Sequence, residues 1–387
     1  MTKVAFTLIG GKDWTGGYNY LLNLFKALAK YESRRITPVL FVGNDINELD
    51  LAPFSTLEGV EIVRSALMDE KSGSLLLIHS ILLGRHVSTV KLFQNNGIQV
   101  VFEAARFFGW RLNIPTIAWI PDFQHKYLRH LFSNRSYWKR DLGFRAQIIC
   151  GRNIMLSSED AKNDCEKFYP SSIKKTHVVR FAVPARSGIT AEKAREVADS
   201  YGLPKYFFIL PNQFWKHKNH TLIIDTLDYL KKRGETIVVA VSGKQSDPRD
   251  PEYFPQIMAR VKQLGLENEF RILGLIPYDH LLALMSLSVA LINPSKFEGW
   301  STTVEEAKAQ GVSLILSDLK VHIEQAGEQA AYFCSDSPIE LANLLAMRIN
   351  SPTENIRPPT KETQSDAVKT FARSFTDYAV AIAQGIK

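Results

Sequence analysis

Long apolar runs and cysteine are both scarce in this chain of 387 residues. No stretch approaches the roughly 18–20 consecutive apolar residues that a membrane-spanning helix needs, so we expect no transmembrane segment. The apolar run near Met1 is too short for a signal peptide and lacks a small-residue cleavage site. The cysteines, Cys150, Cys165 and Cys334, are too few and too widely spaced for a disulfide framework or a metal-binding set. These absences predict a protein of the reducing cytoplasm.

Acidic residues are nearly missing from residues 126–152, where Asp141 is the only carboxylate among seven lysines and arginines. Aromatic and leucine side chains are interleaved with these cations, and the whole chain carries a formal charge of +7. Two interpretations stay open. The segment is either a surface that binds an anionic membrane, or an ordinary solvated basic face around a buried aromatic stripe. No recognised nucleic-acid motif accompanies the charge, so nucleic acid is not the expected partner.

Short apolar runs alternate with helix-compatible stretches along the chain, which contains 45% hydrophobic and 22% charged residues. This alternation predicts the α/β class, with open parallel sheets covered by helices on both faces. Ligands of such sheets bind beyond the carboxyl ends of the strands. We expect strands at residues 4–9, 39–42, 60–63, 75–79, 100–102, 116–120, 148–156, 178–181, 206–210, 236–242, 270–273, 289–292, 312–316 and 331–333.

Two strand ends in the first half of the chain carry candidate site residues. Gly16 and Gly17 open a helical pattern after the first strand, an arrangement that suits either phosphate approach or a tight turn that needs positive φ. Asp122 and His125 follow the expected strand at residues 116–120. They are candidates to line the ligand crevice, although an Asp and a His three residues apart also commonly serve local hydrogen bonding.

A strand–loop–helix–strand unit spans residues 289–316, with Gly311 as the expected left-handed residue after the helix. The free N–H groups at the start of such a helix form a ready site for phosphate. Glu298 and Glu306 frame the loop, with seven residues between them. A capping box of Thr302 and Glu305 would be the structural explanation for the acidic residues. It leaves Glu298 without a structural task, so contact with sugar hydroxyls is the alternative.

Three basic or titratable side chains, Lys216, His217 and Lys218, precede another expected helix. Cations at this position oppose the helix dipole, so an anionic partner is expected to compensate them. This favours a phosphate site over a solvated run of charge.

The segment Ser295-x-Phe-Glu298-Gly-Trp-x-x-x-Val-x-Glu306-Ala-x-Ala-x-Gly311 resembles the E-x7-E segment of retaining glycosyltransferase family 4. The resemblance implies the GT-B fold, in which two Rossmann-like domains face each other across a cleft and a C-terminal helix crosses back. It also implies that Glu298 meets the transferred sugar, Glu306 meets the ribose, and loop amides hold the diphosphate. Lys218-Asn219 matches the family's phosphate-gripping segment.

The residues that the resemblance assigns fall into two groups. The catalytic group is Lys218, Glu298, His125 and Asp122. The donor-binding group is Gly16, Gly17, Asn212, Gln213, Lys216, Lys218, Gly243, Leu275, Ile276, Pro277, Gly299, Trp300, Ser301, Thr302, Thr303 and Glu306.

The chain departs from the family pattern at four of these places. Gln213 stands where Arg is usual, and Lys216 or His217 is expected to supply the missing charge. Pro121 stands where a His is common. Ser301 and Thr303 replace Gly and Pro, which adds hydroxyls near the sugar.

We therefore expect an acceptor domain at residues 1–185, a linker at 186–204, a nucleotide-sugar domain at 205–358 and a helical tail at 359–387 that packs toward the first domain. The expected activity is retaining transfer of a hexosyl unit, such as mannosyl or glucosyl, from a nucleotide-diphosphate sugar. The acceptor is a glycan or lipid-linked molecule of cell-surface polysaccharide synthesis, lipopolysaccharide included, at the inner face of the plasma membrane.

No cofactor or metal is expected, because no Asp-x-Asp motif is present. The donor base, UDP, GDP or ADP, stays open. Two alternatives also stay open: a nonhydrolysing sugar-nucleotide epimerase, and a catalytically weak subunit that binds a nucleotide-sugar.

Overall fold

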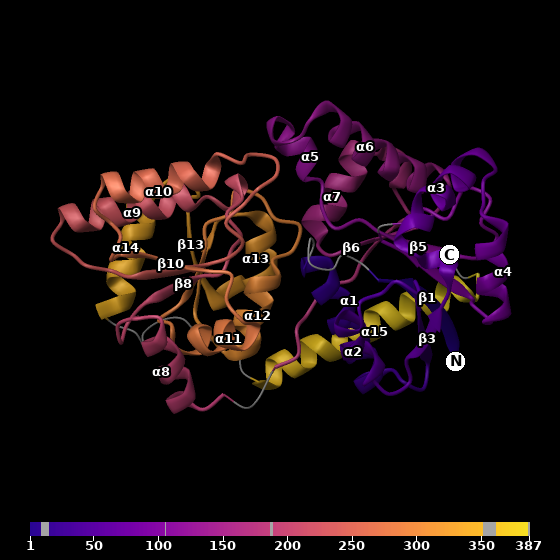
Figure 1. Cartoon of the computed structure of the whole chain (residues 1–387), viewed down its shortest axis with the longest axis horizontal. Coiled ribbons are helices and arrows are strands. Elements are labelled where there is room, and N and C mark those ends of the chain that lie inside the picture. Colours follow the sequence, from indigo (N-terminus) through magenta and orange to yellow (C-terminus); the bar gives the residue numbers. More distant parts are fainter. Residues whose placement is uncertain (9–14, 105, 186–188, 351–360, 386–387) are drawn as a thin grey trace. The chain divides into compact units, whose positions relative to one another are not determined.

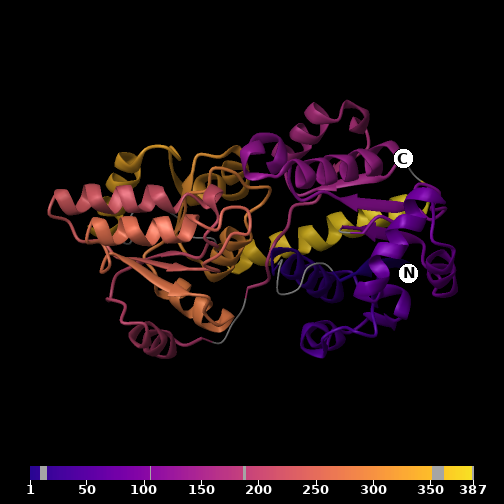
Figure 2. The same ribbon diagram turned by 45° about the horizontal axis from the view of Figure 1, so that its top comes forward.

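The computed structural model describes residues 1–8, 15–104, 106–185, 189–350 and 361–385, which form two compact units. The first unit comprises Met1–Tyr127, Asn134–Pro184 and Asp366–Lys387. The second comprises Leu128–Ser133 and Ala185–Ser365. Each has its own parallel sheet (Figures 1 and 2).

The first unit is built on a seven-stranded sheet in the order β3-β2-β1-β4-β5-β6-β7, all parallel. Its strands are β1 (Thr2–Thr7), β2 (Ile36–Val42), β3 (Glu61–Arg64), β4 (Val100–Glu103), β5 (Thr116–Trp119), β6 (Asn153–Leu156) and β7 (Thr176–Val178). Its helices are α1 (Thr15–Tyr31), α2 (Glu48–Ser55), α3 (Gly73–Leu82), α4 (Val87–Asn95), α5 (Gln124–Tyr127), α6 (Asn134–Ile149), α7 (Glu159–Phe168) and most of α15 (Lys361–Ala383).

The C-terminal helix α15 belongs to the core of the first unit. Phe375 packs against Phe6 of β1, with 5.8 Å between ring centroids, and Phe371 lies 5.9 Å from Tyr20 of α1. Both phenylalanines are fully buried, so their apolar area joins the core and holds the helix there. The return of the helical tail to the first unit is thereby confirmed.

The second unit is built on a six-stranded parallel sheet in the order β10-β9-β8-β11-β12-β13. Its strands are β8 (Phe208–Leu210), β9 (Val239–Ser242), β10 (Phe270–Gly274), β11 (Leu291–Asn293), β12 (Leu314–Ser317) and β13 (Ala330–Phe333). Its helices are α8 (Ala191–Ser200), α9 (His220–Lys232), α10 (Tyr253–Gln263), α11 (Tyr278–Leu287), α12 (Thr302–Gln310), α13 (Lys320–Ala326) and α14 (Pro338–Asn350).

Two apolar layers cover the two faces of this second sheet (Figure 1). One layer packs α9, α10 and α14 against the strands, and the other packs α8, α11 and α12. The central strands are buried on both sides, which explains why they appear in the sequence as continuous apolar runs rather than alternating ones. The predicted α/β class with two Rossmann-like sheets is therefore confirmed.

Two of the expected strands were wrong. Residues 75–79 form the middle of helix α3, because leucine is a strong helix former and only one side of the segment is buried, at Leu76 and Ser80. The expected strand at 148–156 begins only at Asn153. Its first residues end helix α6, and Gly151, with φ of 74°, makes the turn between the two.

Candidate functional site

The order of strands in the second unit reverses between β8 and β11, which lie side by side although other strands separate them in sequence. In open α/β sheets, ligands bind outside the carboxyl ends of strands at such a reversal. Asn212 comes just after β8, and Asn293 is the last residue of β11. Both side chains are buried, and Asn212 Nδ2 donates to Asn293 Oδ1 at 3.1 Å.

Asn293 organises the loop that follows β11. Its Oδ1 also accepts from the backbone N and the Oγ of Ser295, at 3.2 and 2.6 Å. Its Nδ2 donates to Ser301 Oγ at 3.0 Å and lies 3.4 Å from Glu298 Oε1. One fully buried amide therefore fixes the beginning, middle and end of the 294–301 loop.

Glu298 and Lys218 form an ion pair at the centre of the site. Lys218 Nζ lies 2.6 Å from Glu298 Oε1, and Ser295 Oγ donates to the same oxygen at 2.8 Å. Burial alone would raise the pKa of Glu298, but the Lys218 ammonium and its hydrogen bond lower that pKa to about 2. The carboxylate is therefore ionised across the physiological range, and Glu298 has the structural partner that the sequence did not reveal.

A left-handed residue positions Lys218. Lys216–Lys218 form a short 3-10 turn that ends at Asn219, whose φ is 59°. Asn219 Nδ2 donates to the carbonyls of Pro294 and Ser335, at 3.1 and 2.9 Å. An asparagine tolerates this conformation better than most residues, and here its side chain ties the lysine turn to the loop that carries Glu298.

The anions that compensate the basic run before α9 are carboxylates of the same unit. Lys216 pairs with Asp250 at 3.1 Å, and Lys218 pairs with Glu298. Burial, reinforced by the nearby Lys218, lowers the pKa of His217 to about 3. His217 is thus neutral and supplies no charge in place of the arginine usual at Gln213.

The start of α12 differs from the predicted capping box. The helix begins at Thr302, with Ser301 in the cap position and no side-chain cap. Glu305 instead accepts from Lys308 Nζ at 3.0 Å and from Gln325 Nε2 at 2.9 Å. The expected Thr302–Glu305 box is wrong because both partners of Glu305 lie farther along the chain.

Gln325 of α13 holds the backbone of Ser301 by both of its polar groups. Its Oε1 accepts from Ser301 N at 3.2 Å, and its Nε2 donates to Ser301 O at 2.8 Å. The Ser301 amide, which the resemblance assigned to the diphosphate, is therefore already occupied. Glu305 N donates to the carbonyl of Ser301 at 3.2 Å, so the N–H groups of Thr302, Thr303 and Val304 are those that precede the first bond of the helix.

Glu306 lies on the second turn of α12 and is 4% exposed. Its Oε1 accepts from the hydroxyl of Tyr278 at 3.0 Å. Tyr278 begins α11 directly after the loop of Leu275, Ile276 and Pro277. The structure thus joins the second glutamate of the motif to the loop that the resemblance assigned to the base.

Gly243 is required where the loops after β8 and β9 meet. A Cβ built on it would lie 2.4 Å from Asn212 O and 2.8 Å from Gln213 Cα. Any other residue would force these loops apart, so the glycine sets the position of Asn212 and Gln213.

His322 lies behind Glu298 and is fully buried. Its Nδ1 contacts Ser317 O at 3.0 Å, which makes Nδ1 the protonated nitrogen of the neutral ring. Burial lowers the pKa of His322 more than the neighbouring Glu298 raises it. The sequence did not reveal Asn293, Tyr278, His322 and Gln325. The first three lie at a strand end or in a first helical turn, which is the only sequence signal for them, and Gln325, in the last turn of α13, has none.

The first unit holds the other sequence-predicted residues. Gly16 and Gly17 lie in the first turn of α1. Asp122 Oδ1 accepts from Gln124 N at 2.8 Å and from Arg140 Nη2 at 2.7 Å. His125 is fully buried, with Nε2 3.3 Å from the Tyr169 hydroxyl.

Burial, with Arg140 and Lys126 nearby, lowers the pKa of His125 to about 4, so the ring is neutral at pH 7. Asp122 keeps part of its surface, with 26% of the side chain exposed. Of the two, Asp122 has the surface that contact with a substrate requires in this conformation. Among the residues that the structure describes, no three His, Cys, Asp or Glu side chains gather as a metal site.

The comparisons with known proteins agree with this geometry. Residues 193–361 match the family described as "Glycosyl transferases group 1". A sequence search of curated proteins gave no significant match. Among solved structures, a glycosyltransferase from Rickettsia africae ESF-5 superposes with a TM-score of 0.70 at 14% identity, covering 100% of this chain and 98% of that one.

Two further structures are similar over nearly their whole length. HepE of Anabaena, in complex with UDP-glucose, has a TM-score of 0.64 at 14% identity, covering 100% of this chain and 98% of that one. WaaG, described as a glycosyltransferase involved in lipopolysaccharide biosynthesis, has a TM-score of 0.57 at 13% identity and is covered fully, as is this chain. These superpositions over whole chains show that this chain has the GT-B fold. Residues 193–361, somewhat less than half of the chain, are thus similar to the group 1 glycosyl transferases.

Proposed function

We propose that this protein transfers a hexosyl unit, with retention of configuration, from a nucleotide-diphosphate sugar to a glycan or lipid-linked acceptor. One observation carries the proposal. A lysine–carboxylate pair, Lys218 and Glu298, whose side chains are only 14% and 9% exposed, and a buried second glutamate, Glu306, lie at the strand reversal of the second unit. UDP is the favoured base, because HepE of the same fold was solved with UDP-glucose.

Under this proposal the donor lies across the carboxyl ends of β8 and β11. Lys218 and the amides from Thr302 onward stabilise the negative charge that grows on the diphosphate as the sugar departs. Glu298 accepts hydrogen bonds from sugar hydroxyls through the oxygen that Lys218 leaves available. Because the ion pair already exists, the lysine is held in place before the donor binds.

Glu306 accepts hydrogen bonds from the ribose, and the loop from Leu275 to Pro277 contacts the base. The Tyr278 hydroxyl orients the Glu306 carboxylate for this contact. Asn212, Gln213, Lys216 and Gly243 complete the donor surface of the second unit. Gly16 and Gly17 of the first unit approach the diphosphate.

The first unit takes the acceptor in this proposal. Asp122 contacts the attacking hydroxyl, and the departing phosphate accepts the proton. His125 supports this end of the unit from its buried position beside the Tyr169 hydroxyl. Attack occurs on the face that the leaving group vacates, which gives retention. The similarity to WaaG, described as involved in lipopolysaccharide biosynthesis, supports an acceptor of surface polysaccharide synthesis. The proposal places this reaction at the inner face of the plasma membrane.

The test is a donor screen followed by product analysis. Purified protein is incubated with UDP-, GDP- and ADP-hexoses, with and without candidate lipid-linked acceptors, and the anomeric configuration of the product is read by NMR. We expect a UDP-hexose to be consumed with retention. A new epimer formed from the nucleotide-sugar alone would indicate an epimerase, and donor binding without transfer to any acceptor would indicate a non-catalytic subunit.

A further inference from the structure

Helix α3 of the first unit exposes an unusual amount of apolar surface. Leu75, Ile78 and Leu82 lie on one side of the helix by their spacing and are 54%, 50% and 73% exposed. The opposite side buries Leu76 in the core. Contiguous apolar surface on a protein commonly marks an interaction site, so this side of α3 is a candidate contact surface.

A second apolar stripe lies on α6. Trp138, Leu142 and Ile149 share one side of this helix by their spacing and are 54%, 58% and 75% exposed. The aromatic residues on its other sides, Tyr137 and Phe144, are partly buried. Only part of the basic aromatic segment predicted from the sequence therefore reaches the surface.

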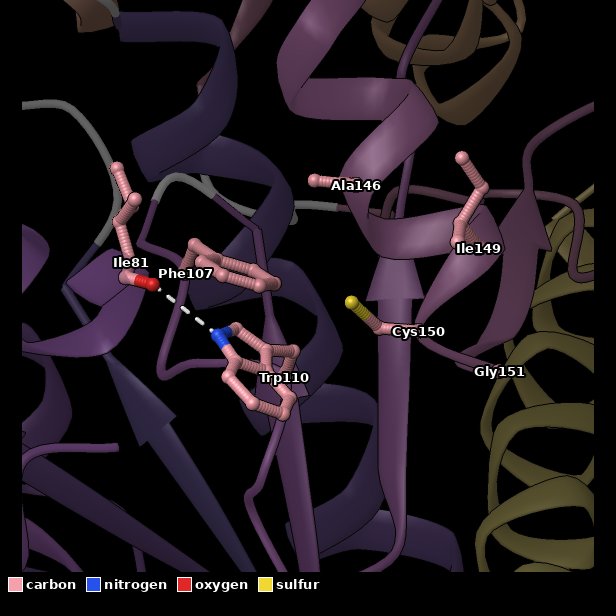
Figure 3. A pocket seen from close by; sticks show the side chains of 7 residues that line it. All are labelled: Ile81, Phe107, Trp110, Ala146, Ile149, Cys150 and Gly151. Atoms are coloured by element: carbon pink, nitrogen blue, oxygen red, sulfur yellow. Dashed lines mark hydrogen bonds between the residues drawn. The ribbon is translucent and has the colours of Figure 1, made fainter. Parts of the chain in front are cut away.

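A pocket of about 630 Å³ joins the two stripes into one surface (Figure 3). Its lining residues are Ile81, Phe107, Trp110, Ala146, Ile149, Cys150 and Gly151. The Nε1 of Trp110 donates to the carbonyl of Ile81 at 3.1 Å. Figure 3 shows Cys150 pointing toward Trp110 from the other side of the pocket, next to Ile149 at the end of α6. We call the exposed apolar side chains of α3 and α6, together with this pocket, the α3–α6 face.

Cations border the α3–α6 face. Arg111 stacks on Trp110, with its guanidinium 5.0 Å from the ring, and Arg85 is exposed next to Gly84, which touches both Trp110 and Arg111. Lys139 is exposed on α6 beside Trp138. The face therefore combines apolar groups with positive charge.

The acidic residues of the same stretch do not offset this charge. Residues 71–152 contain only three, Glu103, Asp122 and Asp141. Glu103 and Asp141 are buried against Arg152 and Lys126 respectively, and Asp122 pairs with Arg140. A second copy of this face would bring like charges together, which disfavours dimer formation through it.

We infer that the α3–α6 face docks on an anionic lipid bilayer, with α3 lying in the interface, Trp110 at the level of the headgroups, and the arginines against lipid phosphates. Among the described residues no single helix has the length and hydropathy to cross a bilayer. Only one bent pair of helical segments reaches that length and hydropathy together, Glu70–Leu82 with Val87–Asn95, and the two are bent by 102°. The inference rests on the lipid-linked acceptor of the proposed function, because docking on the bilayer would bring the acceptor domain to that substrate.

The test is flotation of the full chain with vesicles of phosphatidylcholine alone or mixed with phosphatidylglycerol, without nucleotide-sugar. We expect binding to the anionic vesicles that weakens as salt rises. Replacing two exposed side chains, Ile78→Ser with Leu82→Ser, should weaken it about tenfold. The matched control, Ile339→Ser with Met347→Ser on α14 of the second unit, removes similarly exposed apolar groups and should change nothing.

Arg85→Gln with Arg111→Gln should reduce binding and flatten its salt dependence. Circular dichroism melts show whether each variant is folded. Equal binding to both vesicle types, or equal loss in the α14 control, would overturn the inference. So would a dimer in light scattering that Ile78→Ser with Leu82→Ser dissolves, without vesicle binding. The assay contains no nucleotide-sugar, so an absence of vesicle binding would contradict the docking inference without contradicting the proposed donor site.

Discussion

The two units present opposite kinds of surface chemistry. The second unit buries its polar groups in a connected network, in which Asn293, Gln325 and Asn219 hold the loops that carry Lys218 and Glu298. The first unit exposes apolar groups on α3 and α6 beside the cations Arg85, Arg111 and Lys139. The difference shows two design requirements. A site for group transfer needs side chains held in place before the substrate binds, whereas attachment to a lipid bilayer needs only exposed apolar area and positive charge.

Removing the central lysine of the second unit should lower the transfer rate more than any other change. Lys218→Ala is expected to lower kcat about a hundredfold or more, because it removes charge stabilisation of the departing diphosphate. Steady-state kinetics with a UDP-hexose measures this. Lys232→Ala is the control, since this lysine pairs with Asp228 on the surface of α9. Near-wild-type turnover in Lys218→Ala would remove the lysine from the mechanism.

Removing Glu306 should affect donor binding more than turnover. Glu306→Ala is expected to raise the donor KM about tenfold, the effect of losing one charge-assisted hydrogen bond to the ribose. Tyr278→Phe keeps the carboxylate but removes the hydroxyl that orients it, so it should raise KM in the same direction by a smaller factor. A kcat loss with unchanged KM in Glu306→Ala would place this residue elsewhere in the reaction.

Gln325 offers a test of the preset loop, because it contacts Ser301 rather than any expected ligand atom. Gln325→Leu should raise the donor KM about fivefold by releasing the start of α12. Gln325→Glu should do more harm, because it places a carboxylate against Glu305. Matched melting temperatures with altered KM would identify a positioning role; a KM unchanged in both variants would show that the loop needs no such clamp.

The last prediction concerns how the stability of the second unit depends on pH. The pKa of Glu298 is lowered to about 2, so its contribution to stability is present above its unfolded pKa, about 4.3, and is lost as pH falls toward 2. At about 1.36 kcal/mol per pKa unit, the free energy of unfolding should differ between wild type and Glu298→Gln by about 3 kcal/mol near neutrality, and this gap should close in acid. Urea unfolding across this range measures it, and a gap that widens in acid would contradict the ion pair.

Much of the fold could be predicted from the sequence, because apolar runs and the glycines that end helices are local signals. Gly311 ends α12 with φ of 69°, as its place after the helical pattern predicts. The strand expected at residues 75–79 failed because a short apolar run does not distinguish a buried strand from an outward-facing helix. That error concealed the exposed leucines on which the membrane inference depends.

The sequence predicted the charged residues of the candidate site, but not the residues that hold them in place. The E-x7-E spacing identified Glu298 and Glu306, whereas the partners of Glu305 could not be inferred from a local pattern. Asn293 and Gln325 escaped attention because an amide carries no motif, and its role depends on which loops the fold brings together. Long-range contacts of this kind become visible only in three dimensions.

The most direct test of the donor site is calorimetric titration of UDP-glucose into the wild type and Glu306→Ala. We predict saturable one-to-one binding in the wild type that weakens about tenfold in the variant, while the melting temperatures of the two unliganded proteins stay similar. Equal affinity in both proteins, or no binding of any nucleotide-sugar to a folded wild type, would contradict a donor site at the strand reversal of the second unit.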